Sequence, residues 1–250
     1  MRVLGIIPAR YSSSRFPGKP LIDIEGKSMI QRVYEQSMQC GEMTDIIVAT
    51  DDERIKSHVE AFKGRVVITS PAHQNGTERC AEVMEGMDNS YDLVINIQGD
   101  EPFINPLQIS ALVACFQSNP SVEIGTLKKK IDSLELLMNH GVVKVVCDLN
   151  QRALYFSRSP IPFNRNAEPQ EWLRDGHYYK HIGIYGYLPR ILKRIVKLPM
   201  SSIERIESLE QLRWMENGYN IHVAETFYEA KSIDTPEDLD YVLNNRELFF

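Results

Sequence analysis

The loop after the first apolar segment carries residues suited to binding a polyphosphate. Residues 3–7 form a short apolar run typical of a buried strand, and the loop that follows holds three consecutive hydroxyls at 12–14 and the cations Arg10, Arg15 and Lys19. Cations beside small residues that let backbone N–H groups approach suit the phosphate oxygens. One arginine alone would be read as a solvated surface residue, but three cations directly after a buried strand favour phosphate binding.

This loop differs from the common phosphate-binding motifs. The chain contains no G-x-x-x-x-G-K-[ST], and no G-x-G-x-x-G follows the first strand. These two absences argue against a P-loop kinase or ATPase and against a dinucleotide-dependent oxidoreductase. The phosphate charge must therefore be met mainly by side chains.

Two aspartates far apart in the sequence are candidate ligands for Mg²⁺. Asp100 follows the apolar run 93–97, and a carboxylate just beyond a buried parallel strand lies in the ligand crevice of an open α/β sheet. Asp234 precedes a helix start whose capping is supplied by residues 235–238, so no capping duty is required of it. Carboxylate oxygens suit a Mg²⁺ ion shared with phosphate. A turn at Asp100 and simple capping around Asp234 are the alternatives.

Further polar residues stand where strands and helices are expected to begin or end. Gly76 and Thr77 open a helix, where backbone N–H groups and the helix dipole favour an anion, with plain helix capping as the alternative. His181 and Tyr185 alternate in a strand pattern, so they project from one face and could form the wall of a sugar site. A purely structural histidine is the alternative there.

A single helix is expected over 202–217, ended by Gly218. Ile203 and Ile206 would lie on its buried face. Continuing that face leads to Glu210, which either pairs with Arg213 or lines a pocket.

The order of elements predicts an α/β fold with a mostly parallel, doubly wound sheet and helices on both faces. Parallel strands are expected at 3–7, ended by Pro8, and at 46–49, 66–68 and 93–97. From residue 124 the pattern changes to strands at 124–127, 142–147 and 153–156, with a turn at 148–151. We expect one domain over 1–250, with an antiparallel subdomain over about 124–200 that covers the cleft and makes a dimer contact. Lys128 to Lys130 would end a strand on the surface.

Bulk properties narrow the class of protein. The 250 residues are 43% hydrophobic and 25% charged, which is typical of a soluble globular chain. No apolar run approaches a membrane span and no secretory leader is evident at the N-terminus. The formal charge of −6 argues against nucleic-acid binding. Four scattered cysteines without metal-ligand spacing indicate reduced thiols and a cytoplasmic protein.

Seven motifs together resemble the 3-deoxy-manno-octulosonate (KDO) cytidylyltransferase family, over nearly the whole chain. They are PARYSSSRFPGKPL, HQNGTER, NIQGDEPFI, YFSRSPIPF, YKHIGIYGY, SLEQLR and IDTPEDL. The resemblance implies a nucleotidyltransferase fold, transfer of CMP from CTP to KDO with release of pyrophosphate for lipopolysaccharide biosynthesis, a Mg²⁺ cofactor and a homodimer.

The resemblance also implies the roles of individual residues. It assigns Lys19, Arg10 and Asp100 to catalysis, and Asp100 and Asp234 to Mg²⁺. It places CTP against Pro8, Ala9, Arg10, Arg15, Lys19, Gly76, Thr77 and Arg79. It places the sugar against Gln98, Arg158, His181, Tyr185, Glu210 and Gln211.

Two departures from the commonest family pattern leave the choice of sugar open. Arg205 stands where many relatives carry His, and Ser232 where Gly is usual. The alternative function is therefore a cytidylyltransferase for another acid sugar, such as 8-amino-KDO or a sialic acid. A non-catalytic nucleotide-binding relative or a glycosyltransferase is the more distant alternative. The sequence around Asp100 is not an Asp-x-Asp, and a mere binder would not need two distant aspartates.

Overall fold

The computed structural model describes residues 1–12, 15–87, 91–175 and 177–250, so Ser13 and Ser14 of the predicted hydroxyl run lie outside the described residues. The chain divides into two compact units. Unit 1 comprises residues 1–110, 188–196 and 229–250, and unit 2 comprises residues 111–187 and 197–228. Within the described ranges, no helix combines the length and the apolar composition needed to cross a bilayer.

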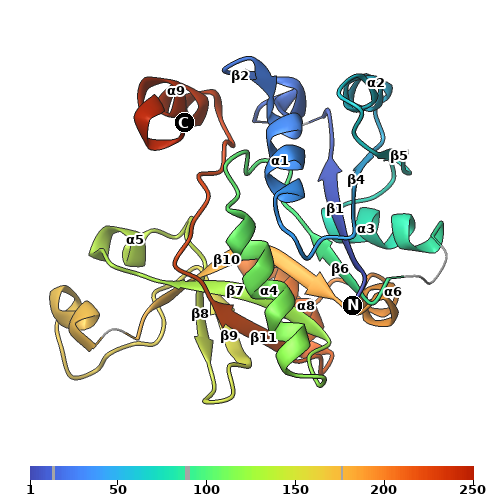
Figure 1. The fold of residues 1–250 in the computed structure, drawn as a ribbon. Helices are drawn as coiled ribbons and strands as arrows, with labels where there is room; N and C mark the ends of the chain where they lie inside the picture. Colours follow the sequence, from blue (N-terminus) through green and yellow to red (C-terminus); the bar gives the residue numbers. More distant parts are fainter. Residues whose placement is uncertain (13–14, 88–90, 176) are drawn as a thin grey trace. The chain divides into compact units, whose positions relative to one another are not determined.

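Unit 1 is built on a parallel sheet. Its strands run in the order β6 (Leu93–Asn96), β1 (Val3–Ala9), β4 (Asp45–Thr50) and β5 (Val66–Ile68), and every pair is parallel. Helices α1 (Met29–Met38) and α3 (Gly76–Glu85) pack against β1 and β4, and Figure 1 shows α1 lying along these strands. The β-branched runs of β1, β4 and β6 are buried, as is typical of strands covered by helices. The predicted parallel α/β core is confirmed.

The helices of unit 1 begin where capping chemistry predicts. Ser28 and Asp52 accept bonds from backbone N–H groups in the first turns of α1 and α2 (Glu53–Ala61), and Pro189 opens α6 (Pro189–Ile195). The remaining elements of the unit are η1 (Lys19–Leu21), β2 (Asp23–Ile24), β3 (Lys27–Ser28), α9 (Pro236–Asn244) and η3 (Arg246–Leu248).

Pro8 does not end the first strand, contrary to the sequence prediction. β1 continues to Ala9 and remains in register with β4, where Pro8 lies opposite Ala49. The pairing of β1 with β6 stops at Ile6 opposite Asn96. Pro8 therefore lies beyond the end of β6, where its missing N–H removes no bond from that side of the sheet.

Unit 2 contains the predicted antiparallel strands. β10 (Tyr179–Tyr187) pairs antiparallel with β7 (Ile124–Lys130), and β8 (Lys144–Cys147) and β9 (Ala153–Ser157) form the predicted hairpin. β11 (Ile221–Glu225), which lies outside the predicted antiparallel segment, joins β7 in parallel. The other elements are α5 (Leu134–Met138), η2 (Pro169–Asp175), α7 (Ser202–Glu207) and α8 (Gln211–Glu216), while α4 (Pro106–Ser118) begins in unit 1 and ends in unit 2.

The predicted surface position of Lys128 was wrong. Lys128 is only 5% exposed, and its Nζ donates to Gln151 Oε1 at 2.8 Å and lies over the ring of Tyr179. β7 ends at Lys130, which is exposed, so the run does end the strand as predicted, and the prediction fails only for the surface position of Lys128.

The expected helix over 202–217 is two short helices. Ser208, at the end of α7, adopts a left-handed conformation (φ 53°), and Leu209 N–H bonds back to the Glu204 carbonyl, which ends the helix. Ile206 is consequently 82% exposed instead of buried. Arg213 of α8 pairs with both carboxylate oxygens of Glu204 in α7.

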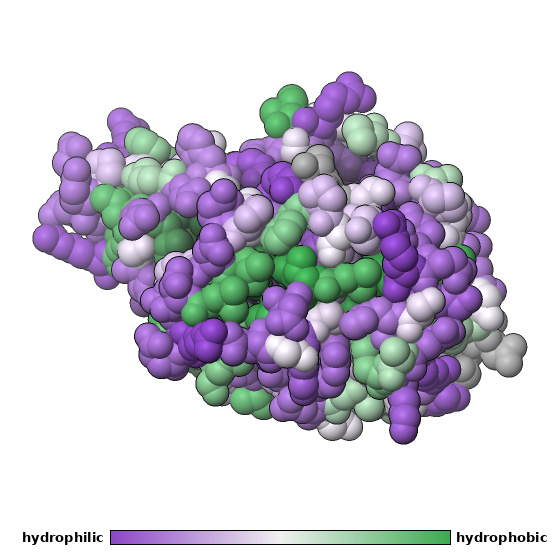
Figure 2. Space-filling view, turned by 90° about the horizontal axis from the view of Figure 1, so that it is seen from above, coloured by the Kyte–Doolittle hydropathy of each residue, from purple (hydrophilic) through white to green (hydrophobic). Residues whose placement is uncertain are grey.

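Hydrophilic residues cover most of the face shown in Figure 2, with hydrophobic residues gathered in patches between them. Several large apolar side chains of unit 2 are more than half exposed: Leu149, Leu154, Phe163, Ile206 and Phe227. Where such side chains form a contiguous patch, they are typical of a surface that meets a partner.

Candidate active site

In unit 1 the predicted phosphate-binding and metal-binding residues come together at Lys19. Lys19 Nζ donates to Asp100 Oδ2 at 2.9 Å and to Asp234 Oδ1 at 3.0 Å, and Arg15 Nη2 lies 3.1 Å from the same Asp234 oxygen. Gly18, just before η1, takes a left-handed conformation (φ 75°) and donates its N–H to the Tyr11 carbonyl. The hydrogen bond from Gly18 to Tyr11 closes the loop after β1, so that Lys19 begins η1 close to the end of β1.

Asp234 reaches Asp100 because the C-terminal helix is anchored on the N-terminal half of unit 1. Ile233 N–H donates to the Asp100 carbonyl at 2.9 Å, and Ile233 is fully buried in a cluster with Ile24, Met29 and Val242. Thr235, two residues after Ile233, caps α9 through the predicted capping box. Asp234 is thereby held outside the helix with its carboxylate on Lys19.

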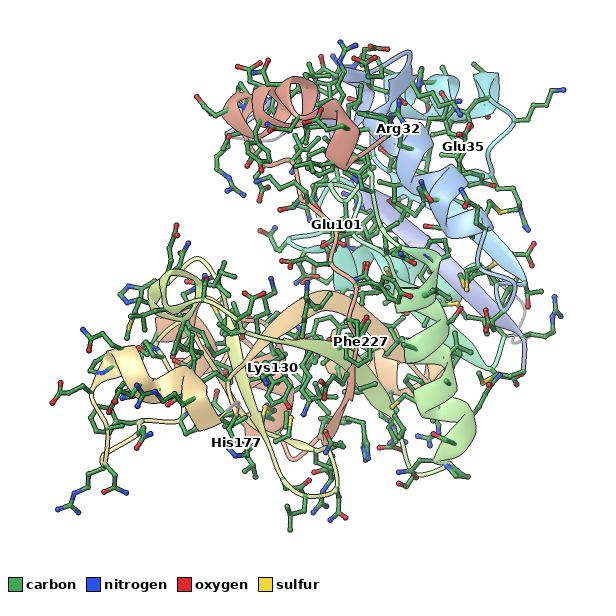
Figure 3. All side chains as sticks on the ribbon, turned by 60° about the vertical axis from the view of Figure 1, so that its left-hand side comes forward. Arg32, Glu35, Glu101, Lys130, His177 and Phe227 are labelled. Atoms are coloured by element: carbon green, nitrogen blue, oxygen red, sulfur yellow. The ribbon has the colours of Figure 1, made fainter. Side chains whose placement is uncertain are left out.

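The acidic groups around Lys19 shift the pKa values of Lys19 and of Glu101. Burial lowers the pKa of Lys19, but Asp100 and Asp234 outweigh it, so that the pKa lies above its usual value. Burial, followed by the charges of Asp100, Glu229 and Asp234, raises the pKa of Glu101 to about 8 (Figure 3). Accumulated negative charge of this kind is relieved by a cation.

The donor set fits a hard divalent cation. Asp100 and Asp234 offer carboxylate oxygens that already share one ammonium group. The described residues show no cluster of three or more side chains that could by themselves hold a metal ion. A Mg²⁺ ion commonly takes only one or two carboxylates and completes its shell with phosphate oxygens and water, so two aspartates suffice.

Two glycines allow backbone segments of unit 1 to approach closely. A Cβ added at Gly99 would lie 2.7 Å from the Pro8 carbonyl oxygen, and one added at Gly76 would lie 3.1 Å from Pro8 Cγ. Gly76 starts α3, which Asn75 caps by accepting the Glu78 N–H. The end of β1, the segment after β6 and the start of α3 therefore meet around Pro8.

We expect Gly99→Ala to lower kcat/KM for CTP by roughly 10²-fold, since a displacement of about 1 Å at a positioning residue has that effect. The added methyl group would push the backbone before Asp100 away from the Pro8 carbonyl. Gly41→Ala is the matched control, because a Cβ at Gly41 meets nothing within 4 Å. Steady-state kinetics of both variants check this, and equal kinetics would contradict it.

Arg10 and Arg79 form a cationic pair in the same unit. Arg79 is fully buried and donates to Thr69 Oγ1 and to Asp51 Oδ2, the latter at 3.2 Å. Arg10 Nη2 is buried and has no hydrogen-bond partner in the described part of the chain. Burial, and then the charge of Arg79, lowers the pKa of Arg10. A buried cation in this state offers a donor to an anionic ligand.

In unit 2 the predicted pair His181 and Tyr185 comes together. Their ring centroids are 5.3 Å apart, and Tyr185 also contacts Trp214 of α8 edge to face. Burial, and then the charge of Glu210, raises the pKa of Tyr185 well above its usual value, so its hydroxyl keeps its proton. Gln211 Nε2 is buried without a partner among the described residues and is a donor open to a ligand.

The hydrogen bonds around His181 define its tautomer. Thr126 Oγ1 lies 2.9 Å from His181 Nε2 and also 2.8 Å from the Ile184 carbonyl and 3.1 Å from that of Ile182. A carbonyl oxygen can only accept, so we assign the single hydroxyl proton of Thr126 to one of these carbonyls. Thr126 Oγ1 then accepts a hydrogen bond from the Nε2–H of His181. Nδ1 is then an acceptor suited to a hydroxyl.

Burial lowers the pKa of His181 to about 3, which predicts an effect on stability at acid pH. In the unfolded chain the imidazole of His181 is protonated below about pH 6.5, whereas in the folded chain it stays neutral down to about pH 3. The free energy of unfolding therefore falls as the pH is lowered from 6.5 towards 3, by up to about 1.4 kcal/mol per pH unit. Denaturant unfolding of the wild type and His181→Gln from pH 4.5 to 7.5 measures it. The variant should lose less stability with acid, and parallel curves would rule the effect out.

The other predicted residues are placed as follows. Arg158 follows β9 and bonds through its guanidinium to the carbonyls of Glu207, His140 and Ser208. Glu210 immediately precedes α8, and Gln98 follows β6 in unit 1. Sequence reasoning missed Thr126, Glu101 and Glu207, because their roles depend on neighbours far away in the chain.

The comparisons with known proteins agree on a family. The family model for cytidylyltransferases matches residues 4–230. A curated 3-deoxy-manno-octulosonate cytidylyltransferase from Bacteroides thetaiotaomicron is 53% identical, over 98% of this chain and 100% of its own. The enzyme of the same name from Phocaeicola vulgatus is 54% identical over 96% of this chain. The chain belongs to the 3-deoxy-manno-octulosonate cytidylyltransferase family.

Solved structures support this family and its fold. CMP:2-keto-3-deoxy-manno-octonic acid synthetase, solved in complex with CTP, is 42% identical with a TM-score of 0.91 and covers 99% of this chain. The 4-diphosphocytidyl-2C-methyl-D-erythritol synthase of Anaerococcus prevotii shares the fold at 12% identity, with a TM-score of 0.62. The predicted nucleotidyltransferase fold and the predicted cytidylyltransferase activity are confirmed.

Proposed function

We propose that this protein activates KDO as CMP-KDO, using CTP and releasing pyrophosphate. The observation that carries this proposal is the junction of Lys19 with Asp100 and Asp234, which combines a cation for phosphate with carboxylates for a metal ion. The relatives named for this reaction match 98% and 96% of the chain.

The reaction is a substitution at phosphorus. The anomeric hydroxyl of the sugar gives up its proton to water as its oxygen bonds to the α-phosphorus of CTP, while the bond from that phosphorus to the bridging oxygen breaks and pyrophosphate leaves. Negative charge builds on the phosphate oxygens, so catalysis requires positioning and preorganised positive charge. Arg10, Arg15 and Lys19 supply that charge in unit 1. Pro8, Ala9, Gly76 and Thr77 would offer backbone atoms to the nucleotide, and Arg79 would add positive charge beside Arg10.

Asp100 and Asp234 would hold Mg²⁺, which when bound neutralises the triphosphate and polarises the reacting phosphate. The Lys19 ammonium group lies between these carboxylates. Removing divalent ions with EDTA should therefore abolish pyrophosphate release, and adding Mg²⁺ should restore it. Full activity in EDTA would remove the metal from the mechanism.

Unit 2 carries most of the proposed contacts to the sugar. Arg158 would pair with the sugar carboxylate, and His181 Nδ1 would accept from a hydroxyl. Tyr185 and Gln211 would donate and Glu210 would accept. Gln98, in unit 1, is a further proposed contact.

We further propose a cytoplasmic homodimer that serves lipopolysaccharide biosynthesis and binds neither nucleic acid nor membranes. The exposed apolar side chains of unit 2, including Leu154 and Phe163, support a contact between two copies. The four cysteines are free thiols, as suits a reducing compartment. Sedimentation of the purified protein would measure the oligomeric state.

The deciding experiment measures pyrophosphate release with CTP and Mg²⁺, offering KDO, 8-amino-KDO and sialic acid in parallel. Release with KDO alone supports the proposal and makes Arg205 and Ser232 incidental. Release only with another acid sugar keeps the chemistry and changes the substrate. If CTP binds but no sugar supports release, the synthetase function is refuted in favour of a non-catalytic binder.

A further inference from the structure

Arg158, the proposed partner of the sugar carboxylate, is held by bonds to both its backbone and its side chain. Its backbone N–H donates to Glu207 Oε2 at 2.9 Å, and Ser157 Oγ donates to the other carboxylate oxygen, Glu207 Oε1, at 2.6 Å. Both oxygens of Glu207 are therefore used to hold the end of β9.

The guanidinium group of Arg158 is oriented by the end of α7. Nε donates to the Glu207 carbonyl at 2.8 Å, and Nη2 lies 3.4 Å from the Ser208 carbonyl. These carbonyls are free of intrahelical partners because α7 ends at Ser208 in its left-handed conformation. An arginine bonded to the last carbonyls of a helix also meets the negative end of the helix dipole.

A third group fixes the backbone of Arg158 from its carbonyl side. Lys144 is fully buried, and its Nζ donates to the carbonyls of Arg158 at 2.7 Å and of Asn139 and Val142, both at 2.8 Å. Burial, and then the charge of Arg158, lowers the pKa of Lys144. The backbone of Arg158 is therefore bonded at its carbonyl by the Lys144 ammonium group and at its N–H by the Glu207 carboxylate.

The anchoring leaves part of the guanidinium free. Arginine has five N–H donors, and Nε, Nη1 and Nη2 each give one to a carbonyl, Nη1 to His140 at 3.2 Å. One N–H remains on each terminal nitrogen, which is what a carboxylate needs for two parallel bonds. A long side chain that is already ordered loses less conformational freedom on binding.

We propose that Glu207 is a positioning residue for the acid sugar: its carboxylate and carbonyl hold Arg158 with two N–H groups ready for the sugar carboxylate. This inference rests on the proposed function. In this proposal Glu207 does not contact the sugar and acts only through Arg158.

The test compares Glu207→Gln with a matched carboxylate elsewhere in unit 2. The glutamine amide is neutral and has one acceptor oxygen in place of two, so only one of the two accepted bonds survives as it is. If that oxygen stays on the Arg158 N–H, the amide NH₂ faces Ser157 Oγ, whose hydroxyl must turn to accept, and both bonds lose the charge of the carboxylate. Asp148 is the control, since it accepts the backbone N–H and the Nε of Arg152, an arginine outside the site, each at 2.8 Å. Asp148→Asn removes the same kind of bonds from the other end of β9.

We expect Glu207→Gln to lower kcat/KM for KDO by about 10- to 100-fold, mainly through KM, as misplacing a binding group does. KM for CTP should stay within about twofold, and Asp148→Asn should leave both constants unchanged. In an Arg158→Ala background, Glu207→Gln should have no further effect, since the two residues act as one unit. An unaltered KM for KDO, or an equal effect in both backgrounds, would refute the proposal.

Two further arms keep the outcome decisive. If Glu207→Gln does not fold, Ser157→Ala removes one bond to the same carboxylate, and an increase of a few-fold in KM for KDO is expected, whereas no increase refutes the proposal. If the wild type releases no pyrophosphate with KDO, the proposed function itself has failed. A wild type active on KDO with an unimpaired Glu207→Gln refutes only the positioning role.

Discussion

Replacing Lys19 with alanine should lower kcat by roughly 10²-fold or more, the usual result of losing a preorganised charge donor. The Lys19 ammonium group is bonded to both Asp100 and Asp234, and these carboxylates keep its pKa raised despite its burial. The variant leaves two carboxylates without this cation and removes positive charge from the proposed triphosphate site. Pyrophosphate release at saturating CTP and Mg²⁺ measures the effect.

Lys27→Ala is the matched control for this variant. Lys27 also belongs to unit 1 and pairs with a carboxylate, Glu35, but the pair is exposed to solvent. Exposed pairs contribute little to stability, so this variant should match the wild type in both kcat and melting temperature. An unchanged kcat in Lys19→Ala would exclude Lys19 from the mechanism.

Replacing Arg213 with methionine should destabilise the protein by about 3–5 kcal/mol, because it leaves a buried carboxylate unpaired. Arg213 donates from Nε and Nη2 to both oxygens of Glu204, at 2.8 and 2.6 Å, and from Nη1 to the Leu198 carbonyl. Both side chains of the pair are less than a tenth exposed. Denaturant unfolding near pH 7 gives the change in free energy.

The double variant Glu204→Leu with Arg213→Met distinguishes the cost of an unpaired buried charge from the loss of the ion pair itself. Removing both charges leaves no buried ion, so much of the lost stability should return. A single variant as stable as the wild type would contradict the prediction. A double variant less stable than Arg213→Met would show that the bonds of Glu204 in the capping box matter more than the unpaired charge.

The local chemistry of the sequence was sufficient for most element boundaries. Ser28, Asp52 and Thr235 each cap the helix that follows them, and such starts are readable in a sequence because an N-cap depends only on residues within one turn. The parallel strands of unit 1 and the hairpin of β8 and β9 were predictable for the same reason: hydrophobic period and turn residues act locally. The motifs also determined the family.

What the sequence could not decide depended on contacts between distant residues. Pro8 continues its strand because β6 happens to end before it, and Ser208 splits the predicted helix through a backbone conformation that no residue type demands. Asp234 meets Lys19 only because the fold packs Ile233 beside residues more than two hundred positions away.

The candidate site divides in the same way. Sequence alone determined which residue types are available: cations in the first loop, aspartates after β6 and before α9, and a histidine and tyrosine on β10. Tertiary structure decided their states, by pairing Lys19 with two carboxylates, giving Arg158 its anchor in Glu207 and setting the tautomer of His181 through Thr126. The physical reason is that charge, burial and hydrogen-bond direction are set by neighbours in space, whereas a sequence lists only neighbours along the chain.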